Sequence, residues 1–202
     1  MDLPKLMNKL QMDEAKRSRL IEVIRKLSYK EGDFTLASGK TSKFYIDLKA
    51  TTLHPEGATL IGELGAQLLQ SGLIKADAIG GLTLGADPIA TAISVVSFQI
   101  GFPIPSLIVR KESKGHGTDQ FVEGKSNVSP GARVLVLEDV ITTGGSSIDA
   151  ILKLKKEGFE PVGVLTVVDR QSGGADRLKS EFGLNLYSLA SIEEIQSLSI
   201  TS

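Results

Sequence analysis

The stretch VLVLEDVITTGGSS, residues 134–147, decides the fold. Its first four residues are apolar, which is typical of a strand buried on both faces of a parallel sheet. Two adjacent carboxylates, Glu138 and Asp139, follow the apolar run, and a loop of hydroxyls and glycines comes next. This loop leads into a helix predicted from Ser146 to Glu157. The order predicts an anion site, because glycines let backbone N–H groups converge at the positive end of a helix.

The two carboxylates indicate which anion the loop binds. They would repel a phosphate, so we expect them to face a neutral or cationic part of the same ligand. Vicinal hydroxyls of a sugar, or a hydrated Mg²⁺ ion, meet that requirement. Hydroxyl donors for the phosphate are Thr142, Thr143, Ser146 and Ser147. The stretch therefore predicts a sugar phosphate ligand, and its strand, loop and helix context disfavours the alternative of acids that merely end a strand before a turn.

Strands and helices alternate along most of the chain. Apolar periodicity and capping residues predict helices at 13–27, 55–70, 87–98, 146–157 and 174–182, and strands at 34–36, 44–48, 78–82, 106–109, 133–137, 162–168 and 184–189. This alternation predicts an α/β fold with right-handed crossovers and a central, mostly parallel sheet flanked by helices. Ligands of such folds bind beyond the carboxyl ends of the strands.

The composition narrows the class of protein. The chain has 202 residues, 41% of them hydrophobic, and a formal net charge of −1, which predicts one globular domain with no global attraction to nucleic acid or membrane. The absence of cysteine excludes disulfides, thiolate zinc sites and a cysteine nucleophile. Neither a signal peptide nor an apolar run of membrane-spanning length is found, so we expect a cytoplasmic location.

The chemistry-bearing motif resembles a known one. VLVLEDVITTGGSS is similar to the phosphoribosyl pyrophosphate binding motif of the type I phosphoribosyltransferases. The resemblance implies that Glu138 and Asp139 hold the ribose hydroxyls and that the loop wraps the 5′-phosphate. The substrate-binding residues implied here are Glu138, Asp139, Val140, Ile141, Thr142, Thr143, Gly144, Gly145 and Ser146. The motif alone does not choose a base.

Segments at other predicted strand ends resemble those of enzymes that use one particular base, orotate. RKESKGHGTD, from Arg110, is similar to the catalytic loop of the orotate phosphoribosyltransferases. The resemblance implies that Arg110, Lys111, Lys114 and His116 bind the substrate, with Lys114, His116 and Asp139 catalytic. VVDRQSGG resembles the segment whose arginine, here Arg170, contacts the orotate carboxylate. FTLASGKTSKFYIDLKATTLHPEG resembles the family's N-terminal hood, and GGLTLGADPIA its pyrophosphate-side turn.

The chain also departs from the family pattern. Ala37 stands where some members carry a hood lysine, and Leu84-Gly85 stands where they carry an aromatic-lysine pair. The contacts that these basic residues make to the base and the pyrophosphate in those members are therefore not expected in this chain. Lys40, Lys43 and Lys49 are candidates to compensate, and the sequence does not choose among them.

The resemblance implies a type I phosphoribosyltransferase fold in a single domain over residues 1–202, with a hood mainly of 1–52 plus the C-terminal end and a core of about 53–183. It also implies transfer of ribose 5-phosphate from 5-phosphoribosyl 1-pyrophosphate to orotate, in UMP biosynthesis. The implied Mg²⁺ is bound mainly through the pyrophosphate, with no protein metal ligands. A homodimer with shared active sites is implied as well, with neither nucleic acid nor a membrane as partner.

The sequence disfavours three other functions. A nucleotide P-loop around Gly39-Lys40-Thr41 is rejected, because its first glycine would fall at Phe34 and a strand follows instead of a helix. A phosphoribosyltransferase for purine bases is disfavoured by the long hood and the VVDRQ segment. A regulator that only senses the ligand is disfavoured, because the catalytic loop is present and no nucleic-acid module is seen. Association with the next enzyme of the pathway is left open.

Overall fold

The computed structural model describes residues 13–35, 41–113 and 120–198. Its centre is a six-stranded sheet in the order β5-β4-β3-β6-β7-β8. All neighbouring strands pair in parallel except the short β5, which is antiparallel to β4. The strands are β3 (Ala78–Leu82), β4 (Ser106–Val109), β5 (Val122–Glu123), β6 (Arg133–Ile141), β7 (Glu160–Asp169) and β8 (Leu186–Ser191). The predicted α/β class with a mostly parallel sheet is confirmed.

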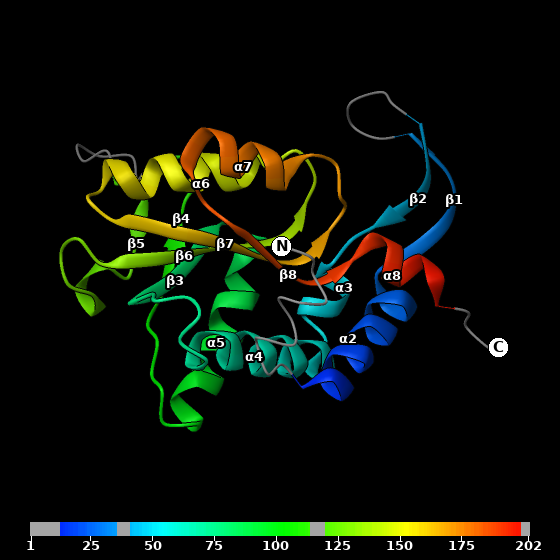
Figure 1. The fold of residues 1–202 in the computed structure, drawn as a ribbon, viewed down its shortest axis with the longest axis horizontal. Helices are drawn as coiled ribbons and strands as arrows, with labels where there is room; N and C mark the ends of the chain where they lie inside the picture. Colours follow the sequence, from blue (N-terminus) through cyan, green and yellow to red (C-terminus); the bar gives the residue numbers. More distant parts are fainter. Residues whose placement is uncertain (1–12, 36–40, 114–119, 199–202) are drawn as a thin grey trace.

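Helices cover both faces of this sheet (Figure 1). One face carries α6 (Gly145–Lys156) and α7 (Gly174–Phe182), and the other carries α4 (Pro55–Gln70) and α5 (Ala86–Gln99). Strand β6 serves both cores, because successive side chains of a strand point to opposite faces. Leu135 and Leu137 join the core with α4 and α5, and Val134 and Val136 join the core with α6. This explains the unbroken apolar run in the sequence.

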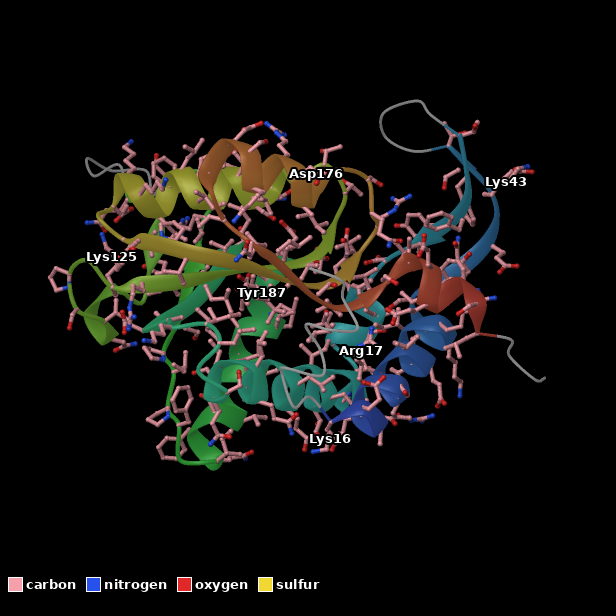
Figure 2. All side chains as sticks on the ribbon, viewed as in Figure 1. Lys16, Arg17, Lys43, Lys125, Asp176 and Tyr187 are labelled. Atoms are coloured by element: carbon pink, nitrogen blue, oxygen red, sulfur yellow. The ribbon has the colours of Figure 1, made fainter. Side chains whose placement is uncertain are left out.

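A smaller unit stands at one end of the sheet. Strands β1 (Tyr29–Thr35) and β2 (Thr41–Ile46) form a separate antiparallel pair beside α2 (Glu14–Leu27) and α8 (Ile192–Ser197) (Figure 1). Asp13 caps α2 by accepting the backbone N–H of Lys16 at 3.1 Å. Arg17 of α2, labelled in Figure 2, is buried and donates to Glu194 of α8 at 2.5 Å. Segments from both ends of the chain are thus held together.

The predicted elements agree with the structure in type, with differences in extent. The strand predicted at 133–137 continues to Ile141, because it stays paired with β7 as far as Asp169. Glu138 and Asp139 therefore lie inside β6 and not after it. The first hood strand begins at Tyr29 and not at 34. Not predicted were α3 (Lys49–Thr52), β5, the 3-10 turn η1 (Lys125–Asn127) and α8.

Ala37 and the last residue of the strand predicted at 34–36 lie outside the described residues. In the part of the chain that the structure describes, no helix is both long enough and apolar enough to span a bilayer.

Candidate active site

The loop between β6 and α6 leaves the N-terminus of α6 accessible to an anion. Gly144 has a φ of 78°, in the left-handed region that favours glycine, and α6 begins at the next residue. The N-cap residue of this helix, Gly144, offers no side chain to the N–H groups of the first turn. Thr143, Gly145 and Ser146 are exposed. The predicted anion cup is therefore accessible, with N–H groups and hydroxyls at a positive helix end.

The carboxylate pair at the end of β6 is electrostatically strained. Glu138 and Asp139 are both partly buried. Burial, with the neighbouring charge of Asp139, raises the pKa of Glu138 to about 7. The Oγ of Ser147 opposes this rise by donating to Glu138 Oε2 at 3.0 Å. Asp139 Oδ1 accepts the backbone N–H of Val140 at 2.8 Å.

Ser147 differs from its predicted role. The sequence suggested a hydroxyl donor for the phosphate, whereas the side chain is buried and donates to Glu138. The reason is helical geometry: Ser147 lies one position further around α6 than the exposed Ser146 and faces the sheet.

The turn after β3 closes against Asp139. A Cβ added to Gly85 would lie 2.9 Å from the carboxyl carbon of Asp139, so a side chain at this position requires Asp139 to move. The peptide bond between Thr83 and Leu84 in this turn is cis. The departure from the family pattern at Leu84-Gly85 thus coincides with a carboxylate that fills the space beside the glycine.

A cleft of about 620 Å³ opens beside this turn and is lined in part by Lys49, Leu84 and Asp87. The Nζ of Lys49 lies 2.7 Å from Asp47 Oδ1, and the hydrogen bond that Lys49 donates to Asp47, together with the charge of Asp139, raises the pKa of Lys49. Burial raises the pKa of Asp87, whose Oδ1 has no hydrogen-bond partner among the described residues. The cleft thus places Lys49 beside the turn that follows β3.

Of the two candidate lysines that the structure describes, Lys49 lines the cleft beside Leu84. Lys43 is exposed, pairs with Asp33 at 2.5 Å and projects from the hood away from the sheet, as Figure 2 shows. Lys40 lies outside the described residues.

The end of β7 contributes Arg170. Its backbone N–H donates to the Ile141 carbonyl at 3.0 Å, which places it beside the end of β6. Its guanidinium lies 4.7 Å from the ring centre of Phe44 in the hood. Arg170 forms no ion pair with any carboxylate in the described ranges, and its Nε has no hydrogen-bond partner there. The charge of this arginine is therefore available to an anionic ligand.

Helix α7 packs against the anion loop. A Cβ added to Gly174 would lie 2.6 Å from the Thr142 carbonyl oxygen, which leaves no room for a side chain. Arg177 Nη1 donates to the Thr143 carbonyl at 3.5 Å. Sequence reasoning missed both contacts, since the glycine was visible only as a helix start.

The end of β4 carries the two basic residues predicted there. Arg110 Nη1 lies 3.4 Å from Glu123 Oε1 of β5. The backbone carbonyl of Lys111 accepts a hydrogen bond from Lys153 Nζ of α6 at 2.8 Å, and the charge of Lys111 opposes the rise in the pKa of Glu138. Arg110 and Lys111 line the same hollow beside Leu84. Lys114 and His116 lie outside the described residues.

The comparisons with known proteins agree with this geometry. Residues 49–199 match the model of the phosphoribosyl transferase domain family. The orotate phosphoribosyltransferase of Nostoc sp. is 48% identical over 180 residues, which cover 89% of this chain and 85% of that protein. The orotate phosphoribosyltransferase of Mycobacterium tuberculosis, crystallised with Fe(III) dicitrate, superposes with a TM-score of 0.78 at 41% identity, covering 91% of this chain and 99% of that one.

A second crystal structure of the mycobacterial enzyme contains 5-phospho-α-D-ribosyl 1-diphosphate, and it matches with a TM-score of 0.74 at 39% identity over 90% of this chain and 99% of that one. The chain belongs to the phosphoribosyltransferase family, and within it to the orotate phosphoribosyltransferases.

Proposed function

We propose that this chain transfers ribose 5-phosphate from 5-phosphoribosyl 1-pyrophosphate to orotate, giving orotidine 5′-phosphate and pyrophosphate, as a step of pyrimidine nucleotide synthesis. One observation carries the proposal: an uncapped helix end and a carboxylate pair lie beside an arginine that has no acidic partner among the described residues. These three features correspond to the phosphate, the ribose and the orotate carboxylate.

The phosphoribosyl group occupies the β6 end of the site in this proposal. The 5′-phosphate accepts N–H groups at the start of α6 and the hydroxyls of Thr142, Thr143 and Ser146. Glu138 and Asp139 accept hydrogen bonds from the ribose hydroxyls. Burial and the neighbouring charge of Asp139 raise the pKa of Glu138, and donors from the ribose oppose that rise.

Orotate lies between the hood and the end of β7. Its carboxylate pairs with the guanidinium of Arg170, whose edge can offer two parallel N–H donors. A ring nitrogen of the orotate anion then attacks the anomeric carbon, and the bond from that carbon to the pyrophosphate oxygen breaks. Positive charge develops on the ribosyl group, and the carboxylates of Glu138 and Asp139 stabilise it.

The leaving pyrophosphate needs cations. Arg110 and Lys111 stand at the end of β4, and Lys114 and His116 follow them in the sequence. We add Lys49 to this set, because it lines the cleft beside Leu84 and feels the charge of Asp139. Lys49 thus takes the place of the basic contacts that are missing at Ala37 and Leu84-Gly85.

The residues present fit a Mg²⁺ ion that arrives with its substrate. Mg²⁺ prefers oxygen ligands in octahedral geometry, keeps several waters and binds readily to substrate phosphates. Within residues 13–35, 41–113 and 120–198 there is no group of three or more acidic or histidine side chains arranged to hold a metal. The partly buried carboxylates at the end of β6 offer acceptors for water of such an ion. When bound, the ion neutralises charge on the pyrophosphate.

A second copy of the chain is the proposed partner. Apolar side chains are exposed beside the cleft and along the outer side of α5: Leu53, Leu84, Val95 and Phe98. Leu84 also lines a second hollow with Arg110 and Thr83, so the apolar surface is continuous with a proposed substrate-binding residue. Burying these side chains in a dimer brings the two sites together and lets Arg110 reach the neighbouring site. A cytoplasmic location and the hood-and-core division stay predictions.

Substitution of Asp139 by asparagine tests the carboxylate role. Asp139→Asn keeps the shape and removes the charge, so we expect turnover to fall by about 10²-fold or more while the circular dichroism spectrum and melting temperature stay close to wild type. Binding of phosphoribosyl pyrophosphate with Mg²⁺, followed by calorimetry, separates a loss of affinity from a loss of rate. Wild-type turnover in this variant would exclude the proposed role of Asp139.

A further inference from the structure

Four side chains connect the hood to the end of β7. The Arg25 guanidinium lies 4.3 Å from the ring centre of Tyr29, and Tyr29 stacks on Phe44 with ring centres 5.6 Å apart at 19°. Phe44 in turn lies 4.7 Å from the Arg170 guanidinium. We call this set, Arg25, Tyr29, Phe44 and Arg170, the hood stack. It is the contact by which an aromatic residue of β2 meets the arginine proposed to bind orotate.

The stack holds Arg170 without using its hydrogen-bond donors. A guanidinium over an aromatic face is attracted by the ring quadrupole, and its planar edge stays free. The Nε of Arg170 is buried and has no hydrogen-bond partner among the described residues. Because an unpaired buried donor is costly, an acceptor supplied by the ligand would be favoured at this place. A carboxylate meets that requirement better than a neutral group.

The aromatic part of the stack is fixed from behind. Tyr29 is buried, with 7% of its surface exposed, and its hydroxyl accepts Gln196 Nε2 of α8 at 3.2 Å. The backbone of β1 pairs with that of β2 at Tyr29 and Ile46. Phe44 therefore stacks on a ring that β1 and α8 hold in place. A long, rotamer-rich arginine is held against a rigid surface, which reduces the entropy lost when it binds a ligand.

The geometry points to Phe44 as a positioning residue that sets the affinity for orotate by holding Arg170 in place. Tyr29 supports Phe44, and the hood thereby contributes to base recognition through a residue that need not touch the base. The inference rests on the proposed contact between Arg170 and the orotate carboxylate. It predicts that the hood stack affects the KM for orotate and leaves the KM for phosphoribosyl pyrophosphate unchanged, because the β6 end of the site does not include it.

A double-mutant cycle tests this inference. Phe44→Leu and Phe44→Met remove the ring and keep an apolar side chain, so that at least one variant is expected to fold, and Phe44→Tyr keeps the ring as the conservative control. Tyr29→Phe keeps the stacking ring and removes only the hydroxyl, which controls for damage to β1 and α8. Arg170→Gln, alone and combined with Phe44→Leu, completes the cycle. Steady-state kinetics give the KM for each substrate and kcat for every variant.

The expected result is specific. Phe44→Leu and Phe44→Met raise the KM for orotate by roughly 3- to 30-fold, the range of one cation–aromatic contact, while Phe44→Tyr and Tyr29→Phe stay near wild type. In the Arg170→Gln background, Phe44→Leu produces no further rise. An equal rise in both backgrounds would overturn the inference, because Phe44 would then act without Arg170.

The same experiment separates the two proposals. If Arg170→Gln raises the KM for orotate and Phe44→Leu does not, the role of Phe44 is wrong while the proposed function stands. If Arg170→Gln leaves that KM unchanged, the proposed contact to orotate fails and the inference fails with it. A rise in the KM for phosphoribosyl pyrophosphate in Phe44→Leu would instead indicate general damage to the site and would also overturn the inference.

Discussion

Replacing Glu138 by glutamine is expected to stabilise the free protein at alkaline pH. Burial and the charge of Asp139 raise the pKa of Glu138 from its ordinary 4.5 to about 7. The folded state therefore binds more protons than the unfolded state between these values, and stability is lost as the pH rises through this window. At about 1.36 kcal/mol per pH unit the full loss is roughly 3 kcal/mol, and because Glu138 keeps some contact with solvent we expect about 2 kcal/mol.

Glutamine carries no charge at any pH in this range and can still accept the bond from Ser147. Glu138→Gln should therefore match wild type near pH 4.5 and exceed it by about 2 kcal/mol at pH 8, which for a chain of this size corresponds to about 4–8 °C in melting temperature. Urea unfolding in phosphate-free buffers measures the difference without ligand binding. Glu160→Gln, at the exposed start of β7, controls for the loss of one charge.

Two outcomes would refute this reasoning. A Glu138→Gln variant less stable than wild type at pH 8 would mean that the ionised carboxylate is stabilised in the free site. A stability difference that does not change between pH 4.5 and pH 8 would mean that its protonation is not linked to folding. In either case the picture of a strained carboxylate pair, relieved by ribose hydroxyls, would be wrong.

Three further predictions concern other parts of the molecule. Gly85→Ala should keep the fold, because the backbone angles of Gly85, a φ of −64° and a ψ of −43°, suit alanine. The new Cβ should displace Asp139 and lower kcat/KM by about 10-fold or more. Unchanged kinetics would contradict the close contact between Gly85 and Asp139. Burial acts to raise the pKa of Glu157, but hydrogen bonds from Lys125 and from the N–H groups of Phe121 and Val122 outweigh burial and lower that pKa. The stability that the ionised Glu157 contributes is therefore present above pH 4.5 and is lost as the pH falls below it. Glu157→Gln should cost about 1–3 kcal/mol at pH 7 and less at pH 3 by urea unfolding, and an equal cost at both would argue against the ionised form. Leu53→Glu should disrupt the proposed dimer and halve the mass measured by light scattering. Leu152→Glu, which also changes an exposed leucine but on α6, should leave the mass unchanged. A Leu53→Glu variant that is still a dimer would place the interface elsewhere.

The parts of the site that are contiguous in sequence could be predicted. The apolar run of β6, the glycines and the helix start lie next to one another in the chain, and their local physics alone indicates an anion cup. The position of Glu138 and Asp139 beside this loop follows for the same reason, while their role in binding ribose stays a prediction. Two details of this stretch were misplaced: β6 continues as long as β7 offers it a partner, and Ser147 is buried and donates to Glu138.

Contacts between distant segments could not be predicted. Gly85 packs against Asp139, the ring of Phe44 contacts the Arg170 guanidinium, and the charge of Asp139 affects the pKa of Lys49. Each pair is widely separated in the chain. Such neighbours are set by tertiary packing, which hydrophobic periodicity does not encode. The strand β5 and the helix α3 were missed for a different reason: they are too short to produce a periodic pattern.

The most direct measurement follows the loss of each base when the purified protein is mixed with Mg²⁺ and phosphoribosyl pyrophosphate and offered orotate, uracil, adenine or hypoxanthine separately. We predict that orotate alone is consumed, that the reaction requires Mg²⁺, and that pyrophosphate appears in equal amount. Consumption of adenine or hypoxanthine instead would contradict the assignment of the hood and Arg170 to orotate. Binding of phosphoribosyl pyrophosphate without consumption of any base would contradict catalysis itself.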